Sequence, residues 1–283
     1  MALFASVLAY GNVRQIRKSV DDLLGRMSRL SGSPANFVRQ AEEKVDTCSP
    51  ALEGFAHRFN VGTDLLLLSA LLGRSWKKYG SLGSHFLTHL EPDAPDISDA
   101  LNGLIGDWKK AVQEDPRLSA LFKKSPSFSY LLTAPQDGSC CKRWCMFLRW
   151  MGRKDELDPG LWGKGSPLQK TFPSSRYLKP SQLVLPLDTH TGRISQYLGL
   201  TKRKSLNWLA AQEVTASLKE CDSQDPSRYD FALARLGILD LCRHRYVEEI
   251  CGRCDLVNFC QFARKGRARA RAASHSRKSV RKV

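Results

Sequence analysis

The sequence predicts an all-α fold, and two observations support that prediction. Apolar residues recur in several segments at the spacing of a buried helix face. No segment of real length alternates apolar and polar residues, as a half-buried strand would. With 42% hydrophobic and 25% charged residues in a chain of 283, the composition is that of a globular protein. It excludes a wholly disordered, collagen-like or coiled-coil chain.

The predicted helices follow one another along the chain. Residues 13–30 combine an apolar stripe with a charged face, which is typical of an amphipathic helix. Residues 65–78 are apolar enough to be largely buried, and Asp64 is the expected cap of that helix. Further helices are predicted near 97–112, at 141–151, around 206–218, and from the capping pair Asp225-Pro226 to about 239.

Three other segments have a different character. The chain opens on an apolar helix that starts at Met1 without a capping residue or a preceding basic segment, so we expect no signal peptide. Residues 152–180 are rich in Gly, Pro and Lys and predict a long insertion, and 181–187 are a strand-like piece too isolated to build a sheet. No stretch approaches the ~20 apolar residues that a membrane span needs, so we expect no membrane association.

Positive charge is concentrated at the end of the chain. The sequence has 44 Lys and Arg against 28 Asp and Glu, a net charge of +16, and residues 264–283 hold nine of these basic residues and no acidic one. The remaining 1–263 are only moderately basic. We predict that 264–283 form a disordered basic tail. A basic body with a strongly basic tail favours a polyanionic partner, either nucleic acid or an anionic surface.

Four of the nine cysteines lie close together in the sequence. Cys242, Cys251, Cys254 and Cys260 have the spacing C-x8-C-x2-C-x5-C. Four thiolates within so short a segment can surround one metal centre, either a structural zinc ion or a 4Fe-4S cluster, and the spacing does not separate the two. The pattern suits a metal site in a reducing cytoplasm better than a disulfide framework.

Two further motifs precede the cysteines. A predicted helix–turn–helix at 127–151 contains Gly138 and Ser139 and continues as CCKRWCMFLRWM from Cys140, and the segment PLDTHTGRISQYLGL starts at Pro186. Together with the cysteine cluster, this order of motifs resembles the helix-hairpin-helix DNA glycosylase superfamily, in its endonuclease III-like branch with a C-terminal iron–sulfur loop. The two segments are most similar to an uncharacterised bacterial family within that superfamily.

The resemblance implies a two-lobed, all-α helix-hairpin-helix glycosylase-like fold over 1–263, with the hairpin at about 127–151, the insertion at about 152–180 and the cluster loop at 242–260. DNA would lie across the cleft between the lobes. The resemblance also implies a 4Fe-4S cluster rather than zinc. The sequence differs from the family hairpin at Cys140, which stands where a second glycine is usual in the family.

The resemblance also implies roles for single residues. In bifunctional members a lysine begins the second hairpin helix and an aspartate follows in a V-D-T-H motif, and Lys142 and Asp188 match these positions. Backbone N–H groups at Gly138 and Ser139 would bind a DNA phosphate, as helix N-termini do. Further phosphate contacts are predicted at two basic side chains, Arg143 and Arg193.

The residues themselves fit this chemistry. An enzyme that cuts a base from a duplex must flip the nucleotide into a pocket. Asp188 precedes a predicted helix, so it would be an N-cap whose carboxylate can stabilise positive charge on the sugar. Lys142, as a neutral amine, would form a Schiff base with the sugar. The simpler alternatives are that Asp188 is only a cap and that Lys142 only contacts phosphate.

We therefore predict a DNA N-glycosylase, with or without abasic-site lyase activity, that acts on a damaged or modified base in DNA repair. The alternatives are a non-catalytic DNA- or RNA-binding relative and an N-glycosidase that acts on RNA or a nucleoside. The expected partner is double-stranded DNA. We expect a monomer in the cytoplasm, associated with the nucleoid.

Overall fold

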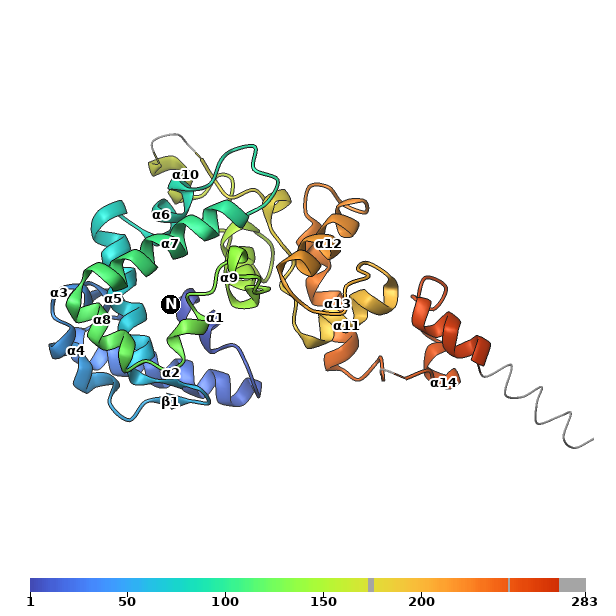
Figure 1. The fold of residues 1–283 in the computed structure, drawn as a ribbon, viewed down its shortest axis with the longest axis horizontal. Coiled ribbons are helices and arrows are strands. Elements are labelled where there is room, and N and C mark those ends of the chain that lie inside the picture. The colour runs from blue at the N-terminus through green and yellow to red at the C-terminus, as the bar shows by residue number, and fades with distance from the viewer. Residues whose placement is uncertain (173–175, 244, 270–283) are drawn as a thin grey trace, which may run out of the picture. The chain divides into compact units, whose positions relative to one another are not determined.

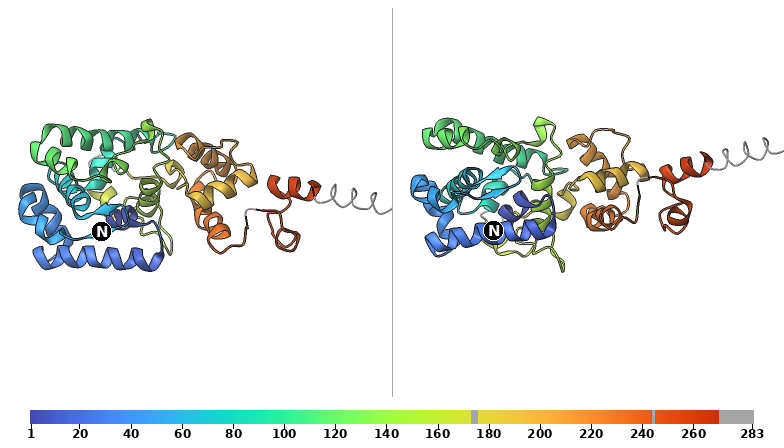
Figure 2. Two further views of the ribbon diagram at one scale, coloured as in Figure 1. Left: turned by 60° about the horizontal axis from the view of Figure 1, so that its bottom comes forward. Right: turned by 90° about the horizontal axis from the view of Figure 1, so that it is seen from below.

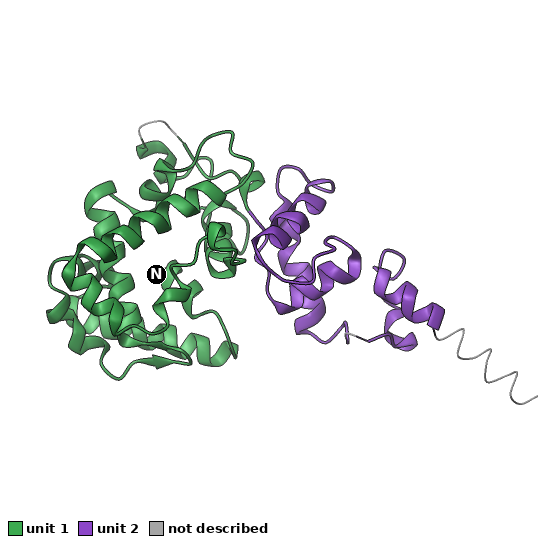
Figure 3. Cartoon of the chain, in the orientation of Figure 1, with its two compact units in different colours: residues 1–183 green, residues 184–283 purple. Residues whose placement is uncertain are grey.

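The computed structural model describes residues 1–172, 176–243 and 245–269, and it confirms the predicted all-α class (Figure 1). The one sheet in these residues is a short antiparallel ribbon of β1 (Ala56–His57) and β2 (Asn60–Val61). The chain divides into two compact units, 1–183 and 184–283 (Figure 3). No helix in the described part of the chain is long and apolar enough to cross a membrane.

Unit 1 is a bundle of helices joined mostly by short loops. Its elements, besides the ribbon, are α1 (Ala2–Leu8), α2 (Val13–Ser31), α3 (Pro34–Glu43), α4 (Val45–Leu52), α5 (Gly62–Tyr79), α6 (Leu82–Thr88), α7 (Ser98–Glu114), α8 (Pro116–Lys123), α9 (Lys142–Gly152) and α10 (Pro167–Thr171), with 3-10 turns η1 (Phe128–Tyr130), η2 (Pro135–Asp137) and η3 (Pro180–Gln182).

Helix α5 forms the centre of unit 1. It lies between α2 and α7 (Figure 2), and its leucines from Leu65 to Leu68 are at most 1% exposed. The helix is therefore largely buried, as the sequence predicted, and only its last turns carry exposed lysines, Lys77 and Lys78. Asp64 is not the N-cap but the third residue of the helix, where its carboxylate accepts the N–H of Val61, the true N-cap, at 2.9 Å.

Two glycines allow neighbouring helices to approach the α5 backbone closely. A Cβ atom on Gly73 would lie 2.4 Å from the carbonyl oxygen of Val38 in α3, and one on Gly62 would lie 2.0 Å from that of Leu52 in α4. Real Cβ atoms are essentially never this close to another heavy atom. The packing of α3 and α4 on α5 therefore depends on hydrogen at these two positions.

The predicted insertion at 152–180 is irregular in its described residues, with α10 as its one helix, but it is firmly attached to unit 1. The N–H of Trp162 donates to Met151 O at 2.7 Å, and its indole stacks on Phe86. Asp158, 1% exposed, pairs with Arg153 at 2.6 Å and Arg149 at 3.3 Å. These contacts fix the segment in place without regular secondary structure.

Unit 2 contains α11 (Thr189–Leu198), α12 (Trp208–Lys219), a 3-10 turn η4 (Pro226–Tyr229), α13 (Asp230–Ile238) and α14 (Glu248–Cys251), and residues 261–269 are also helical. The predicted helix from Pro226 thus begins with a 3-10 turn. The strand-like segment is buried and extended from Val184 to Leu187, but it pairs with no strand because Thr215 Oγ in α12 accepts the Leu185 N–H at 3.0 Å.

The prediction of a disordered tail from residue 264 is wrong for 264–269. Residues 264–269 continue the helix that begins at 261, because Phe262 stacks on Tyr197 and Gly266 packs against Tyr246. The rest of the predicted tail, 270–283, lies outside the described residues. The sequence analysis also did not predict five helices of unit 1, which are α3, α4, α6, α8 and α10.

The close approach at Gly73 leads to a stability prediction. Gly73→Ala should lower the free energy of unfolding by about 1–3 kcal/mol, because the new methyl group meets backbone in α3 that cannot move without separating the two helices. The matched control is Gly106→Ala in α7, where a Cβ meets nothing within 4 Å, and helix propensity should stabilise that variant by up to about 1 kcal/mol. Urea denaturation measures both. Equal effects in the two variants would contradict the packing described here.

Candidate active site

A pocket of about 650 Å³ lies in unit 1 where the end of α1, the turn of the β1–β2 ribbon and the start of α9 meet. Three of the residues predicted from the sequence line it, namely Ser139, Lys142 and Arg143. Three aromatic residues that the sequence analysis did not select also line it, namely Tyr10, Phe59 and Tyr130. The pocket thus combines cationic and aromatic side chains.

Lys142 is the first residue of α9, as the sequence predicted. Its side chain is half-buried on the pocket wall and makes no hydrogen bond or ion pair with another described residue. The preceding residue, Cys141, is the N-cap with a left-handed backbone, and no side chain caps the helix. The first N–H groups of α9 therefore lack side-chain acceptors at the positive end of the helix dipole.

The predicted first helix of the hairpin is not an α-helix. Two 3-10 turns, η1 and η2, take its place, and Gly138 ends η2 with a positive φ of 77°. The Gly138 N–H donates to Pro135 O at 2.9 Å, so this amide is engaged within the turn and is not available to a phosphate. Ser139 Oγ accepts the N–H of Cys141 at 3.2 Å. The N–H groups at the start of α9 are the better placed phosphate donors.

The aromatic side of the pocket is built by the ribbon. Tyr10 donates its hydroxyl hydrogen to His57 O or to Asn60 Oδ1, at 2.9 and 2.7 Å, which fixes the ring against the ribbon. Phe59, at the ribbon turn, stacks on Tyr10 with ring centroids 6.1 Å apart and planes 5° from parallel. Phe59 is 66% exposed and Tyr130 70% exposed. Large aromatic faces are therefore open to solvent beside Lys142.

Two guanidinium groups accompany these rings. Arg143 lies 4.5 Å from the centroid of Tyr10, and Arg58 lies 5.8 Å from the centroids of both Tyr10 and Phe59. Burial lowers the pKa of Arg143 from its ordinary value. Cation–π contacts of this kind hold the guanidinium groups at the pocket, where they can also bind an anion.

The neighbours of Lys142 are structural. Trp144 is 4% exposed, and its indole N–H donates to Leu131 O at 3.0 Å, so it is part of the core. Burial raises the pKa of the Cys141 thiol to about 12. A thiol with that pKa stays protonated at neutral pH, so Cys141 is not a nucleophile there.

Asp188 belongs to unit 2 and is the N-cap of α11, as the sequence predicted. Its Oδ1 accepts the N–H of Thr191 at 2.7 Å, and its side chain is half-buried. His190, from the same motif, packs against Gly237 in α13, where a Cβ would meet its Nδ1 at 2.4 Å. Arg193 is exposed on α11.

The four cysteines of the predicted metal site are half-buried in unit 2, and none of the nine cysteines forms a disulfide. Cys260 precedes the helix at 261–269, and its Sγ accepts the Ala263 N–H at 3.3 Å. Burial, with the nearby thiols of Cys242 and Cys260, raises the pKa of Tyr197, so the two ends of the motif flank one ring. No three of the four sulfur atoms, all in described residues, lie within 4.8 Å of one another.

The fold and the pocket define an all-α protein with a basic, aromatic-lined pocket. Residues 1–239 match the model of a family described as a protein of unknown function (DUF2400). The match covers most of the chain, and the chain belongs to this family. It ends before Cys242, so the four clustered cysteines lie outside the matched region. No curated protein and no solved structure matches the chain.

Proposed function

We propose that this protein is a DNA N-glycosylase of the helix-hairpin-helix type with abasic-site lyase activity, and that Lys142 is its nucleophile. The observation that carries the proposal is the position of Lys142 at the N-terminus of α9, on the wall of a pocket with exposed aromatic rings and the guanidinium group of Arg143. The pocket volume of about 650 Å³ is in the usual range for small-molecule sites, and a single nucleotide fits such a volume.

The pocket residues suit a nucleotide that has left the duplex. Phe59 and Tyr130 offer open ring faces on which a base can stack, and stacking on aromatic side chains is a general way to hold an unpaired base. Arg58, Arg143 and the first N–H groups of α9 supply donors for a flanking phosphate. Double-stranded DNA is therefore the partner we propose, and nucleoid association follows from it.

The proposed reaction begins at the sugar. The neutral amine of Lys142 attacks C1′, the glycosidic bond breaks, and the base leaves with the bonding electron pair and is protonated. The attacking nitrogen loses a proton and the sugar ring opens, which gives an imine between Lys142 and C1′. Loss of the 3′ phosphate by elimination then cuts the strand, and water releases Lys142.

Asp188 is the carboxylate in this proposal. Its cap bond to Thr191 uses Oδ1 and orients the group, while Oδ2 accepts no hydrogen bond from a described residue. A carboxylate oriented in this way can stabilise the positive charge that develops on the sugar as the base departs.

We also propose that the four cysteines hold a 4Fe-4S cluster. Four half-buried thiols in the spacing C-x8-C-x2-C-x5-C support the proposal of a metal centre. The choice of a cluster over a zinc ion rests on the resemblance of the order of motifs to the iron–sulfur branch of the glycosylase superfamily. When bound, the cluster would join the ends of the 242–260 loop.

The basic pocket also suits the second candidate, a relative that binds DNA or RNA without catalysis. Such a protein would need the aromatic rings and the guanidinium groups but not a nucleophilic amine. An N-glycosidase that acts on RNA or a nucleoside is a third candidate, since it would use the same carboxylate chemistry. The experiments on Lys142 and Asp188 separate these candidates.

A covalent intermediate should form at Lys142. Borohydride should trap the wild-type protein on a duplex with a substrate lesion, because it reduces the imine to a stable amine. Lys142→Gln should abolish trapping and leave DNA affinity nearly unchanged, since one charge is a small part of a many-contact interface. The matched control is Lys170→Gln, which makes the same charge change at an exposed residue of α10 that does not line the pocket. Trapping that persists in Lys142→Gln would contradict the assignment.

Base release should depend on Asp188. Asp188→Asn removes the charge but keeps an oxygen that can cap α11, so folding should survive while base release slows by about 100-fold or more. Glu220→Gln, at an exposed position of the same unit, serves as the control for loss of one negative charge. Release of the free base from a lesion panel measures both. Normal rates in both the Asp188 and Lys142 variants would favour the non-catalytic alternative.

Iron content tests the cluster proposal. Protein purified without oxygen should be brown and contain about four irons per chain. Cys254→Ser should lose most of this iron, whereas Cys221→Ser, which changes an exposed cysteine of the same unit outside the motif, should keep it. Stoichiometric zinc without visible absorbance would show that the site is a zinc site instead.

A further inference from the structure

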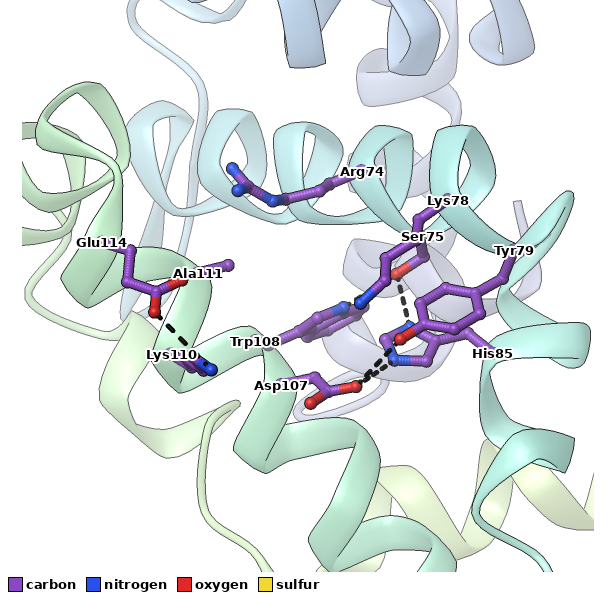
Figure 4. Close-up of a pocket in the computed structure, with 10 residues that line it drawn as sticks. All are labelled: Arg74, Ser75, Lys78, Tyr79, His85, Asp107, Trp108, Lys110, Ala111 and Glu114. Atoms are coloured by element: carbon purple, nitrogen blue, oxygen red, sulfur yellow. Dashed lines mark hydrogen bonds and ion pairs between the residues drawn. The ribbon is translucent and has the colours of Figure 1, made fainter.

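A second cluster of polar side chains lies in unit 1, at the end of α6 and on the facing side of α7 (Figure 4). His85 in α6 and His89, which caps its C-terminus, both direct Nε2 at the same carboxylate oxygen, Oδ2 of Asp107 in α7. The two N–O distances are 2.9 and 3.1 Å. None of the three residues lines the pocket around Lys142.

The distances between these nitrogen and oxygen atoms are close to the distance between two neighbouring ligands of a metal ion. Zn–N bonds are ~2.0–2.1 Å, so neighbouring ligands of a tetrahedral ion lie about 3.3 Å apart. The three donor atoms all lie within 4.8 Å of one another, and two of the separations are within a few tenths of an ångström of that distance. Two imidazoles and one carboxylate form a common ligand set for divalent transition metals.

The hydrogen bonds behind His85 are compatible with the tautomer that a metal requires. Ser75 Oγ contacts three groups: the indole N–H of Trp108 at 2.9 Å, Leu71 O at 3.1 Å and Nδ1 of His85 at 3.0 Å. The indole can only donate, so the single hydroxyl hydrogen of Ser75 must go either to Leu71 or to His85.

If Ser75 donates to Nδ1 of His85, the ring carries its hydrogen on Nε2 and donates it to Asp107. The other arrangement exposes the lone pair of Nε2. If Ser75 donates to Leu71 O, then Nδ1–H of His85 donates to Ser75, and all three contacts are hydrogen bonds. In that case Nε2 of His85 presents a lone pair to the carboxylate of Asp107 at 2.9 Å. A lone pair facing a carboxylate is repulsive unless a cation binds both. Metal-bound histidines are generally held by a hydrogen bond at the other ring nitrogen, as here.

The position of His89 depends on a glycine. A Cβ on Gly103, one turn before Asp107 in α7, would lie 2.4 Å from Nδ1 of His89 and 2.5 Å from its Cγ. Because Gly103 has no Cβ, the ring of His89 can pack against the α7 backbone and reach the carboxylate of Asp107. On the other side, Tyr79 stacks on His85 with ring centroids 4.0 Å apart. Both imidazoles are thus held from outside the cluster.

One side of the cluster is open. The side chains of Asp107 and His89 are 38% and 29% exposed, and a pocket of about 200 Å³ adjoins His85 and Asp107. Two cations at its rim are already paired, Arg74 with Asp115 at 3.2 Å and Lys110 with Glu114 at 3.7 Å. A metal held here by three protein ligands would therefore keep a position for water or a small ligand.

We propose that His85, His89 and Asp107 form a binding site for one divalent transition-metal ion of the zinc type, with an open position toward this pocket. The ligand atoms are Nε2 of both histidines and a carboxylate oxygen of Asp107. The site is independent of the cysteines and of the proposed chemistry at Lys142.

Cobalt(II) is the probe that distinguishes this site from the cysteines. Full-length protein with its native iron content is treated with a chelator that removes weakly held metals and then titrated with Co²⁺. Nitrogen and oxygen ligands give visible d–d bands without the sulfur-to-cobalt charge-transfer absorption that thiolates produce. One such ion per chain is the expected result, and Zn²⁺ should displace it.

Variants locate the ion. His89→Ala and Asp107→Asn should each weaken Co²⁺ binding by at least about 100-fold, since loss of even an outer partner of a metal ligand costs roughly 10- to 100-fold. Gly103→Ala keeps all three ligands but displaces His89, and it should weaken binding as well. Asp99→Asn, exposed in the first turn of the same helix, is the control and should bind as the wild type does. Circular dichroism verifies that each variant is folded.

The outcomes decide the proposal. Loss of the nitrogen/oxygen-type cobalt spectrum in the His89 and Asp107 variants, with Asp99→Asn unaffected, supports the site. If the wild-type protein gives no such spectrum, or if Asp107→Asn binds Co²⁺ as tightly as the wild type, the cluster is a hydrogen-bond network and the proposal is wrong.

Discussion

The burial of α5 from Asp64 to Leu71 is the constraint on which the rest of unit 1 depends. Because this part of the helix is apolar on nearly every side, other elements must cover it, and Gly62 and Gly73 let two of them approach the backbone of α5. Its N-terminal end adjoins the ribbon that carries Phe59 and fixes Tyr10. Its C-terminal turn carries Ser75, which contacts both Trp108 and His85. The two sites proposed for unit 1 are thus organised at opposite ends of one buried helix.

The polar groups at these two ends are arranged in different ways. At the N-terminal end, Oδ2 of Asp64 accepts the N–H of Val61 and the side-chain amide of Asn60, and Asn60 Oδ1 in turn accepts the Tyr10 hydroxyl, while Oδ1 of Asp64 is buried without a partner among the described residues. At the C-terminal end, Ser75 has one hydrogen for two acceptors. The first arrangement suits a preformed recognition surface, since stacking needs fixed rings. The second leaves a choice of tautomer that a bound cation would settle.

The sequence predicted the helices correctly where interactions between residues close in the chain determine them. Periodicity located α2, α5 and α7, and cap chemistry placed Asp188 at the start of α11. The short helices α3, α4, α6, α8 and α10 were missed because each has too few turns to establish a period. The first hairpin helix was expected from the motif alone, but the Pro and Gly that bound η2 allow only a 3-10 turn there.

The sites could be predicted only in part, for a related reason. Lys142 and Arg143 were predicted from the motif. Tyr10, in contrast, is held at the pocket by hydrogen bonds to His57 and Asn60, which lie 47 and 50 positions further along the chain, and no local sequence pattern indicates such contacts. The metal site had a visible signal in the four-residue spacing of His85 and His89, but its carboxylate is 22 positions from His85 and comes from another helix. Contacts of this kind depend on how helices pack, and packing is a property of the folded chain.

The central claim is that Lys142 is the nucleophile of the pocket, and the most direct test is to identify the amino acid that carries the sugar. After borohydride reduction on lesion DNA, nuclease and protease digestion followed by mass spectrometry should find the sugar remnant on the side-chain nitrogen of Lys142. Attachment to a different residue, or wild-type protein that releases the base without any covalent adduct, would contradict the claim.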